Sequence, residues 1–168
     1  MLVLILRKNG EFSMNNDQLM LSQLKSLLAD EHSPVTILAN ASALINQTVD
    51  QLNWVGFYRY DHANDELVLG PFQGRVACMH IKMGAGVCGT AAQDRKVQVV
   101  ADVSQYPGYI SCDAAAKSEL VVPLVRQDGS LYGVLDLDAP VRDRFDKQLV
   151  ATMTTSAAII MKAIDEAA

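Results

Sequence analysis

The sequence predicts a single α+β domain in which N- and C-terminal helices pack on a largely antiparallel central sheet. Two helical patterns come first, a run of strand-like segments separated by turns fills the middle, and one long helical pattern ends the chain. The length of 168 residues suits one domain that is large enough to bury a core, and neither an internal repeat nor a linker divides it.

The first part of this pattern holds two helices. Residues 17–30 carry leucines at helical spacing, namely Leu19, Leu24, Leu27 and Leu28. A second helix is expected to begin at Pro34, because Ser33 is a favourable N-cap and proline is favoured at the first helical position. The apolar face of this second helix comprises Ile37, Leu38, Ala41, Leu44 and Ile45.

The middle of the chain is rich in strand signals, since short segments of aromatic and β-branched residues alternate with turn residues. Strands are expected at residues 53–60, 66–72, 77–83, 97–103, 118–125 and 131–139. A short helix is expected at 86–95, and residues 104–117 form a long connection of the kind that is often functional. The dipeptide Asp128-Gly129 joins the last two strands as a hairpin, and residues 143–168 are expected to form one long amphipathic helix.

The composition is that of an ordinary soluble protein, with half of the residues apolar, 20% charged and a net charge of −5. Nucleic acid is not an expected partner, because its binding needs clustered basic residues and these are scattered here. A membrane is not expected either, since no apolar stretch approaches the length of a span. The start, MLVLILRKNGEFS, is unlike a signal peptide, because its basic residues follow the short apolar run. We therefore expect a cytoplasmic protein.

The first thirteen residues are interpreted as an extension to the domain. A second methionine, Met14, directly follows them. Residues 1–13 would then be non-native or the product of a mis-assigned start, and the domain itself is expected to span residues 14–168.

The predicted hairpin gathers three carboxylates on one patch of sheet. Side chains alternate along a strand, so Asp136 and Asp138 share a face. A turn centred on residues 128 and 129 places Glu119 opposite Asp138. Like charges that face each other across strands are destabilising, so the patch calls for a compensating role. The alternative is a wet sheet edge, where all three carboxylates are solvated and have no function.

Trp54 and Tyr58 are four residues apart on one predicted strand, so both point to the same face. Composition alone favours core packing for them, because aromatic residues in strands usually have that role. An aromatic wall beside carboxylates would instead suit a small ligand with a cationic group or a thioether.

The three cysteines, Cys78, Cys88 and Cys112, are expected to be buried, metal-bound or reactive, since a reducing compartment disfavours a disulfide framework. Cys78 and His80 share a predicted strand face, and the other two cysteines would complete a Cys3His zinc set. The paired spacing of structural zinc sites is missing, however, so no metal is expected. Cys88 lies near a predicted helix N-terminus, where the helix dipole should favour its thiolate.

Four segments together resemble the free methionine-(R)-sulfoxide reductases, enzymes built on a GAF domain. They are NWVGFYRY, LVLGPFQGRVACMHIKMGAGVCGTAA, YISCDAAAKSELVVPL and GVLDLDAP with the following RFD. The resemblance extends from about Leu19 to the C-terminus, and residues 1–13 have no counterpart in it. It implies a single GAF domain. Since most GAF domains bind small molecules or take part in signalling, the fold alone would not indicate an enzyme.

The resemblance also implies a role for each residue singled out above. Cys112 would be the nucleophile, and one or both of Cys78 and Cys88 would resolve the oxidised intermediate, with Cys78 favoured as the more frequent partner. The implied substrate-binding residues are Trp54, Tyr58, Glu119, Asp136 and Asp138.

The implied reaction reduces free L-methionine (R)-S-oxide to L-methionine. A thiolate attacks the sulfur, and the oxygen must be protonated as it leaves. Crowding raises the pKa of carboxyl groups, so one of the three could supply this proton while the others meet the ammonium group of the substrate. The sulfenic acid left on the enzyme condenses with a second thiol, and thioredoxin is expected to reduce the disulfide without any cofactor in the protein.

Two questions stay open at this point. The sequence does not assign the proton donor among the carboxylates, and it does not distinguish a monomer from a homodimer. The alternative function is a non-catalytic GAF module that binds a small molecule or senses redox state.

Overall fold

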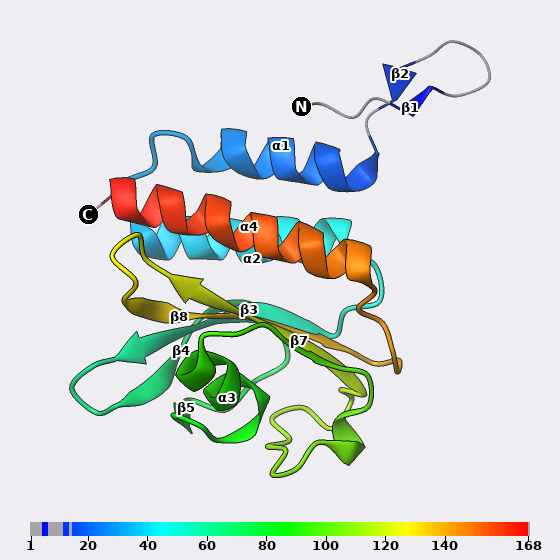
Figure 1. Cartoon of the computed structure of the whole chain (residues 1–168). Coiled ribbons are helices and arrows are strands. Elements are labelled where there is room, and N and C mark those ends of the chain that lie inside the picture. Colours follow the sequence, from blue (N-terminus) through cyan, green and yellow to red (C-terminus); the bar gives the residue numbers. More distant parts are fainter. Residues whose placement is uncertain (1–4, 7–11, 14, 168) are drawn as a thin grey trace.

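A six-stranded sheet lies in the middle of the molecule, with a larger layer on one face and a smaller layer on the other (Figure 1). The computed structural model describes residues 5–6, 12–13 and 15–167. Its sheet consists of β3 (Trp54–Asp61), β4 (Glu66–Gly74), β5 (His80–Lys82), β6 (Gln98–Val100), β7 (Ser118–Val125) and β8 (Leu131–Ala139). The strands lie in the order β5-β4-β3-β8-β7-β6, and neighbours pair antiparallel. The predicted α+β class is confirmed.

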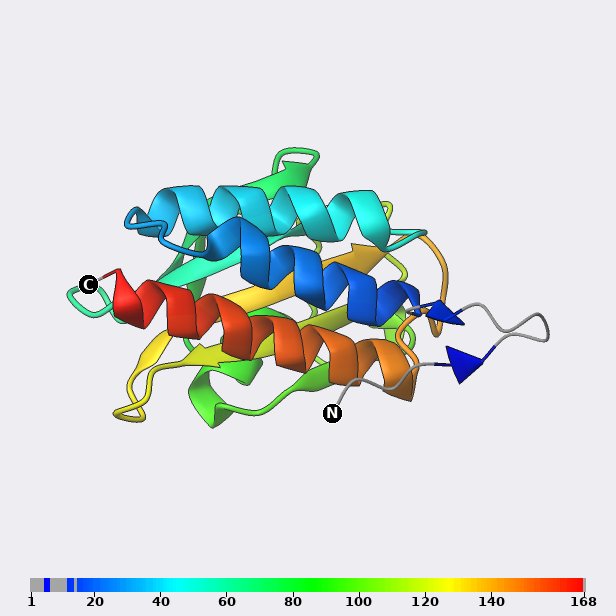
Figure 2. The same ribbon diagram turned by 90° about the horizontal axis from the view of Figure 1, so that it is seen from above.

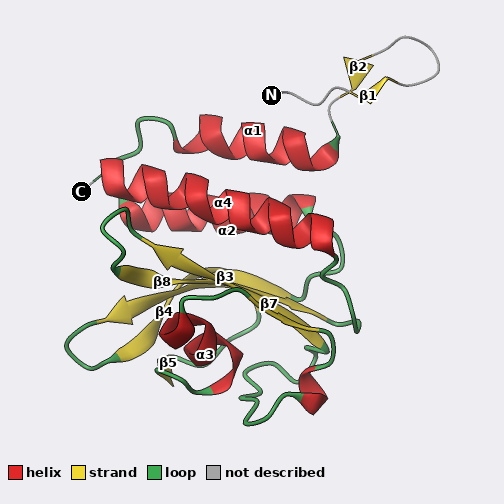
Figure 3. Cartoon of the chain, viewed as in Figure 1, coloured by secondary structure: helices red, strands yellow, loops and turns green. Residues whose placement is uncertain are grey.

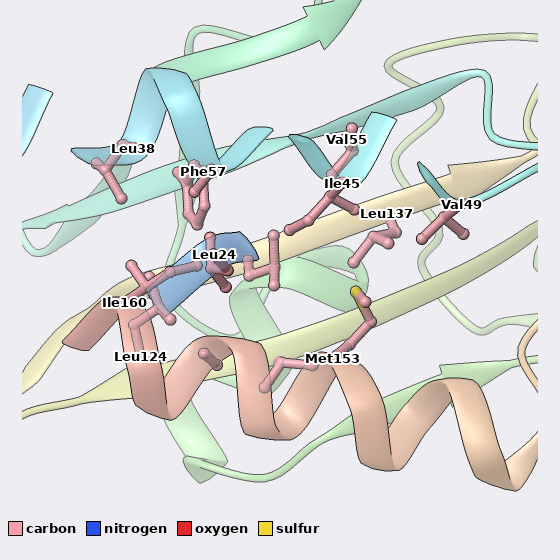
Figure 4. Packing of buried hydrophobic residues seen from close by; sticks show 14 of the residues in the cluster. Leu24, Leu38, Ile45, Val49, Val55, Phe57, Leu124, Leu137, Met153 and Ile160 are labelled. Atoms are coloured by element: carbon pink, nitrogen blue, oxygen red, sulfur yellow. The ribbon is translucent and has the colours of Figure 1, made fainter. Parts of the chain in front are cut away.

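Three helices cover one face of the sheet, namely α1 (Asn16–Leu28), α2 (Pro34–Thr48) and α4 (Lys147–Glu166). Helices α2 and α4 lie next to the strands, and α1 lies across them on the side away from the sheet (Figures 1 and 2). Alternate residues of the central strands meet these helices, as the two-residue period of a strand requires. Figure 4 shows Leu24, Ile45, Leu137 and Met153 within this main core.

The other face of the sheet carries α3 (Gly86–Asp94) and the long connection, which includes the short helix η1 (Val103–Gln105) (Figure 3). A second, smaller cluster of buried residues lies there and includes Trp54, Tyr58 and Cys88. One face of the sheet thus carries the main core, and the other face carries the smaller cluster.

Local signals fix the helix ends. The Ser33 side chain caps α2 by accepting a hydrogen bond from the Thr36 amide at 3.4 Å, as predicted. The last helix begins at Lys147, so the prediction of a start at residue 143 is wrong. Asp146 caps it by accepting a hydrogen bond from the Leu149 amide at 2.8 Å, and the preceding residues form a turn instead.

Two of the predicted strands are shorter in the structure. The strand expected at 77–83 is reduced to His80–Lys82, so Cys78 lies in the loop of residues 75–79 and not on a strand. The strand expected at 97–103 ends at Val100. The strands expected at 118–125 and 131–139 have the predicted bounds.

At the N-terminus, β1 (Ile5–Leu6) pairs antiparallel with β2 (Phe12–Ser13). The interpretation of residues 1–13 as an extension, with the domain beginning at residue 14, falls largely on positions outside the described residues. Within the described part of the chain, no helix combines the length and the apolar character that a membrane crossing needs.

Candidate active site

The register of the β7–β8 hairpin gathers the carboxylates as predicted. Glu119 lies directly opposite Asp138. On the other side of β8, strand β3 places Trp54 opposite Asp138 and Gly56 opposite Asp136. The carboxylates and the aromatic pair therefore share the sheet face that points away from α2 and α4.

Trp54 and Tyr58 form a continuous aromatic wall, and each is only 2% exposed. The Trp54 ring stacks on Tyr58 with centroids 5.9 Å apart and on Phe72 with centroids 5.3 Å apart. Gly56 makes this stack feasible, because a Cβ atom at that position would overlap both Phe72 and the Trp54 ring. Trp54 and Tyr58 are thus packed in the interior, as composition favoured, and they also line a cavity.

The three carboxyl groups are largely removed from water, which contradicts the alternative of a wet sheet edge. Glu119 is 5% and Asp136 is 6% exposed. Burial, followed by the charges of the neighbouring aspartates, raises the pKa of Glu119 well above its usual range. Burial, and then the charge of Asp136, also raise the pKa of Asp138 well above its usual range. Burial raises the pKa of Asp136 to about 7. Protons are therefore held in this cluster near neutral pH.

Cys88 carries a free, buried thiol in contact with this cluster. Its Sγ donates a long hydrogen bond to Glu119 Oε1 at 3.8 Å. Burial, and then the charges of Asp136 and Glu119, raise the pKa of the Cys88 thiol well above its usual range. The prediction of a thiolate favoured by the helix dipole is therefore wrong. Cys88 does lie in the first turn of α3, but a dipole contributes only about 0.3–2 kcal/mol and is outweighed by dehydration and like charge.

Cys78 and Cys112 form a disulfide, with their Cα atoms 5.3 Å apart. This is the pairing that the resemblance favours. Cys112 belongs to the long connection before β7, where Asp113 shapes a turn by accepting a hydrogen bond from the Ala115 amide at 2.9 Å. Asn53 ties this turn to the start of β3 with a hydrogen bond to Asp113 at 2.9 Å.

The Cys3His zinc set is not assembled. Cys78 and Cys112 are bonded to each other. His80 is exposed and lies 2.7 Å from the Glu66 carboxylate, whereas Cys88 is buried. Cys78 lies in a loop, so it does not share a strand face with His80. The four residues therefore do not form the zinc site that the sequence suggested.

A cavity of about 30 Å³ lies between the aromatic wall, the carboxylates, Cys88 and Cys112. That is room for about two water molecules. The cavity also has lining residues that sequence reasoning missed, namely Ala77, Ile81, Ala85, Gly86, Val87, Tyr109, Ile110 and Asp113.

Tyr109, Ile110 and Asp113 could have been suspected, since all three lie within three residues of Cys112 in the long connection. Ile110 packs on Gly86 at the start of α3. Glycine is favoured at that position for two reasons, because its φ is +61° and because a Cβ atom would press on the Ile110 side chain at 3.2–3.4 Å. The connection thus closes over the cavity against the helix.

The buried thiol gives a first testable prediction. In disulfide-bonded protein, Cys88 is expected to react with Ellman's reagent about 10²-fold or more slowly than in unfolded protein, because both access and thiolate content are low. The absorbance change before and after addition of denaturant measures this. Rapid reaction of one thiol per native chain would contradict the buried, protonated state of Cys88.

Comparison with known proteins gives consistent matches. A model of the family described as "GAF domain" matches residues 31–165. The free methionine-R-sulfoxide reductase of Escherichia coli is 46% identical over 135 residues, which cover 76% of this chain and 80% of that protein. The reduced form of fRMsr of Staphylococcus aureus aligns with a TM-score of 0.85 at 51% identity, covering 89% of this chain and 95% of that one.

A third match is the free methionine-R-sulfoxide reductase of Neisseria meningitidis, whose structure was solved in complex with its substrate. It aligns with a TM-score of 0.86 at 36% identity and covers 99% of this chain and 98% of that one.

Proposed function

Because this chain belongs to the free methionine-R-sulfoxide reductases, a family of GAF domains, we propose that it reduces free L-methionine (R)-S-oxide to L-methionine, with Cys112 as the nucleophile. The observation that carries this proposal is the Cys78–Cys112 disulfide at a cavity lined by an aromatic wall and by buried carboxyl groups. A module that only binds a small molecule has no use for a disulfide at its ligand cavity, and turnover of the sulfoxide distinguishes a reductase from a module that senses redox state.

The carboxyl cluster supports recognition of a free amino acid. Asp136 Oδ1 is buried and accepts no hydrogen bond from the described residues. A buried acceptor of this kind is costly unless a donor reaches it. The ammonium group of the substrate is such a donor, and it would favour the ionised form of Asp136. The Trp54 ring offers an apolar, polarisable surface to the side chain that carries the sulfoxide.

The same cluster supports the proton transfer that the chemistry requires. Burial raises the pKa values of Glu119 and Asp138 well above the usual range, and the charge of Asp136 raises both further, which favours their protonated forms. The Cys112 thiolate attacks the substrate sulfur and forms an S–S bond, and the sulfoxide oxygen takes a proton from one of these two acids. The hydroxyl group then moves from the substrate sulfur to the Cys112 sulfur as the S–O and S–S bonds to the substrate sulfur break, so the sulfoxide is reduced by two electrons and the cysteine is oxidised by two. The products are L-methionine and a sulfenic acid on Cys112.

Regeneration completes the cycle. Cys78 attacks the sulfenic sulfur of Cys112, the disulfide forms, and the oxygen leaves as water. Cys78 is the proposed resolving cysteine, whereas Cys88 keeps its thiol in the carboxyl cluster, where its high pKa disfavours attack. Thioredoxin in the cytoplasm is the proposed reductant of the disulfide, by thiol exchange. No cofactor in the protein takes part in these steps.

The proposal predicts a narrow substrate range. With thioredoxin, thioredoxin reductase and NADPH, the free (R)-sulfoxide should drive NADPH oxidation, whereas the (S)-epimer and the N-acetylated (R)-sulfoxide should be at least about 10²-fold poorer. Acetylation removes the ammonium charge and leaves a buried carboxyl group without its donor. Absorbance at the NADPH wavelength measures the rates. Equal rates for free and acetylated substrate would contradict the role of the carboxyl cluster, and no oxidation with any of them would favour the binding module.

A further inference from the structure

The loop that carries Cys78 is fastened to the aromatic wall by hydrogen bonds to its backbone. The Tyr58 hydroxyl donates to the carbonyl oxygen of Cys78 at 3.0 Å. Trp54 Nε1 donates to the carbonyl oxygen of Arg75 at 3.1 Å. Both donors come from β3, which lies in the middle of the sheet, so the loop is tied at two points to a rigid element.

Large apolar side chains contribute little to the placement of this loop, although the small side chains of Ala77 and Cys78 pack against the smaller buried cluster. Val76 is 87% exposed and Met79 is 70% exposed, so the large apolar side chains on either side of Cys78 project into solvent. Beyond the two bonds from the wall, the Leu69 amide donates to the Met79 carbonyl at 3.0 Å where the loop enters β5. Among the described residues, the one side-chain hydrogen bond to the backbone of Cys78 comes from Tyr58.

Tyr58 is well suited to this task. It is 2% exposed, so its hydroxyl would be an unpaired buried donor without the Cys78 carbonyl. Its ring stacks on Trp54, and both rings line the cavity. The bond sets where the Cys78 backbone lies, and thereby where its Sγ meets Cys112.

We infer that Tyr58 is a positioning residue for the resolving cysteine, and that its hydroxyl serves disulfide closure between Cys78 and Cys112. The inference rests on the proposed function and assigns a second task to a residue that also lines the substrate cavity. The step that it serves is the attack of the Cys78 sulfur on the sulfenic sulfur of Cys112, in which an S–S bond forms, an S–O bond breaks and water leaves.

The test uses Tyr58→Phe, which removes the hydroxyl and keeps the ring. Its matched control is Tyr60→Phe on the same strand, whose hydroxyl binds Asp65 on the surface. The first measurement needs no substrate, because it titrates the Cys78–Cys112 pair in mixtures of reduced and oxidised dithiothreitol. Loss of one buried hydrogen bond should lower the equilibrium constant for closure about 3- to 10-fold. The disulfide would then become about 15–30 mV easier to reduce, and the control should match the wild type.

The second measurement separates the two chemical steps in a single turnover without reductant. In Tyr58→Phe, disulfide closure should slow about 3- to 10-fold more than methionine formation does in the same variant. Dimedone should therefore trap more sulfenic acid on Cys112 than in either the wild type or Tyr60→Phe. A merely structural role for Tyr58 would slow both steps together.

Two results would overturn the inference. One is a Tyr58→Phe titration that coincides with the wild type, and the other is a loss confined to methionine formation. If the wild type itself forms no methionine, the proposed function fails, yet the dithiothreitol titration still decides whether Tyr58 positions Cys78.

Discussion

Replacement of Cys112 by serine is expected to abolish the reduction of free methionine sulfoxide, with a loss of about 10⁴-fold or more. A serine hydroxyl is a far weaker nucleophile towards sulfur than a thiolate. Neither of the other thiols can substitute, because Cys88 is buried and its pKa is raised, and Cys78 is held outside the cavity lining by the Tyr58 hydrogen bond. Cys112 lies in a connection outside both buried clusters, so the fold should persist.

The informative control is Cys78→Ser, measured in a single turnover of reduced protein without thioredoxin. That variant should release one equivalent of methionine and then stop at the sulfenic acid, whereas Cys112→Ser should release none. Thermal unfolding of both variants beside reduced wild-type protein checks their folding. Methionine release by Cys112→Ser at a rate near that of the wild type would remove Cys112 from the role of nucleophile.

Replacement of Asp136 by asparagine is expected to slow turnover by about 10²- to 10³-fold, since it removes the carboxylate that we propose as the partner of the substrate ammonium group. The same change should leave the protein equally or more stable. Burial raises the pKa of Asp136 to about 7 from a usual value of 3.8, so the folded state disfavours its charge. The asparagine side chain could still hydrogen-bond with its neighbours and would carry no charge in the crowded cluster.

The gain in stability should depend on pH in a defined direction. Below pH 3.8 the carboxyl group is neutral in both the folded and the unfolded chain, and its ionisation costs nothing. Between pH 3.8 and about 7 the unfolded chain gives up the proton while the folded chain keeps it, so the wild type loses stability as the pH rises. The free-energy advantage of Asp136→Asn should therefore grow across this range and level off above it.

Urea unfolding at pH 5 and at pH 8 measures this difference. Asp94→Asn, an exposed residue at the end of α3, is the control and should show neither the kinetic nor the stability effect. Asp138→Asn should behave like Asp136→Asn, because burial also raises its pKa. A clear loss of stability with normal kinetics would mean that these carboxyl groups serve the fold and not the reaction.

The sequence by itself determined the features that depend on neighbours along the chain. The two-residue period assigned Asp136 and Asp138 to one face of their strand. The Asp128-Gly129 turn predicted the pairing of Glu119 with Asp138, which the structure confirms, although a shift between Leu124 and Val125 changes the register next to the turn. The helical spacing and the Ser33 cap likewise located α2. These signals suffice because a turn or a repeat acts on residues that are close in sequence.

The tertiary structure alone decided how these pieces form a site. Strand β3 pairs with β8 across more than seventy residues of chain, and that contact brings Trp54 to Asp138. Cys78 is placed by a hydrogen bond from Tyr58, twenty residues earlier, and not by the strand that its own neighbours suggested. Cys88 keeps its proton although it lies in the first turn of a helix, because burial and the carboxyl groups of β7 and β8 outweigh the dipole of its own helix. Burial and charge depend on everything packed around a group, and segments distant in sequence supply most of those neighbours.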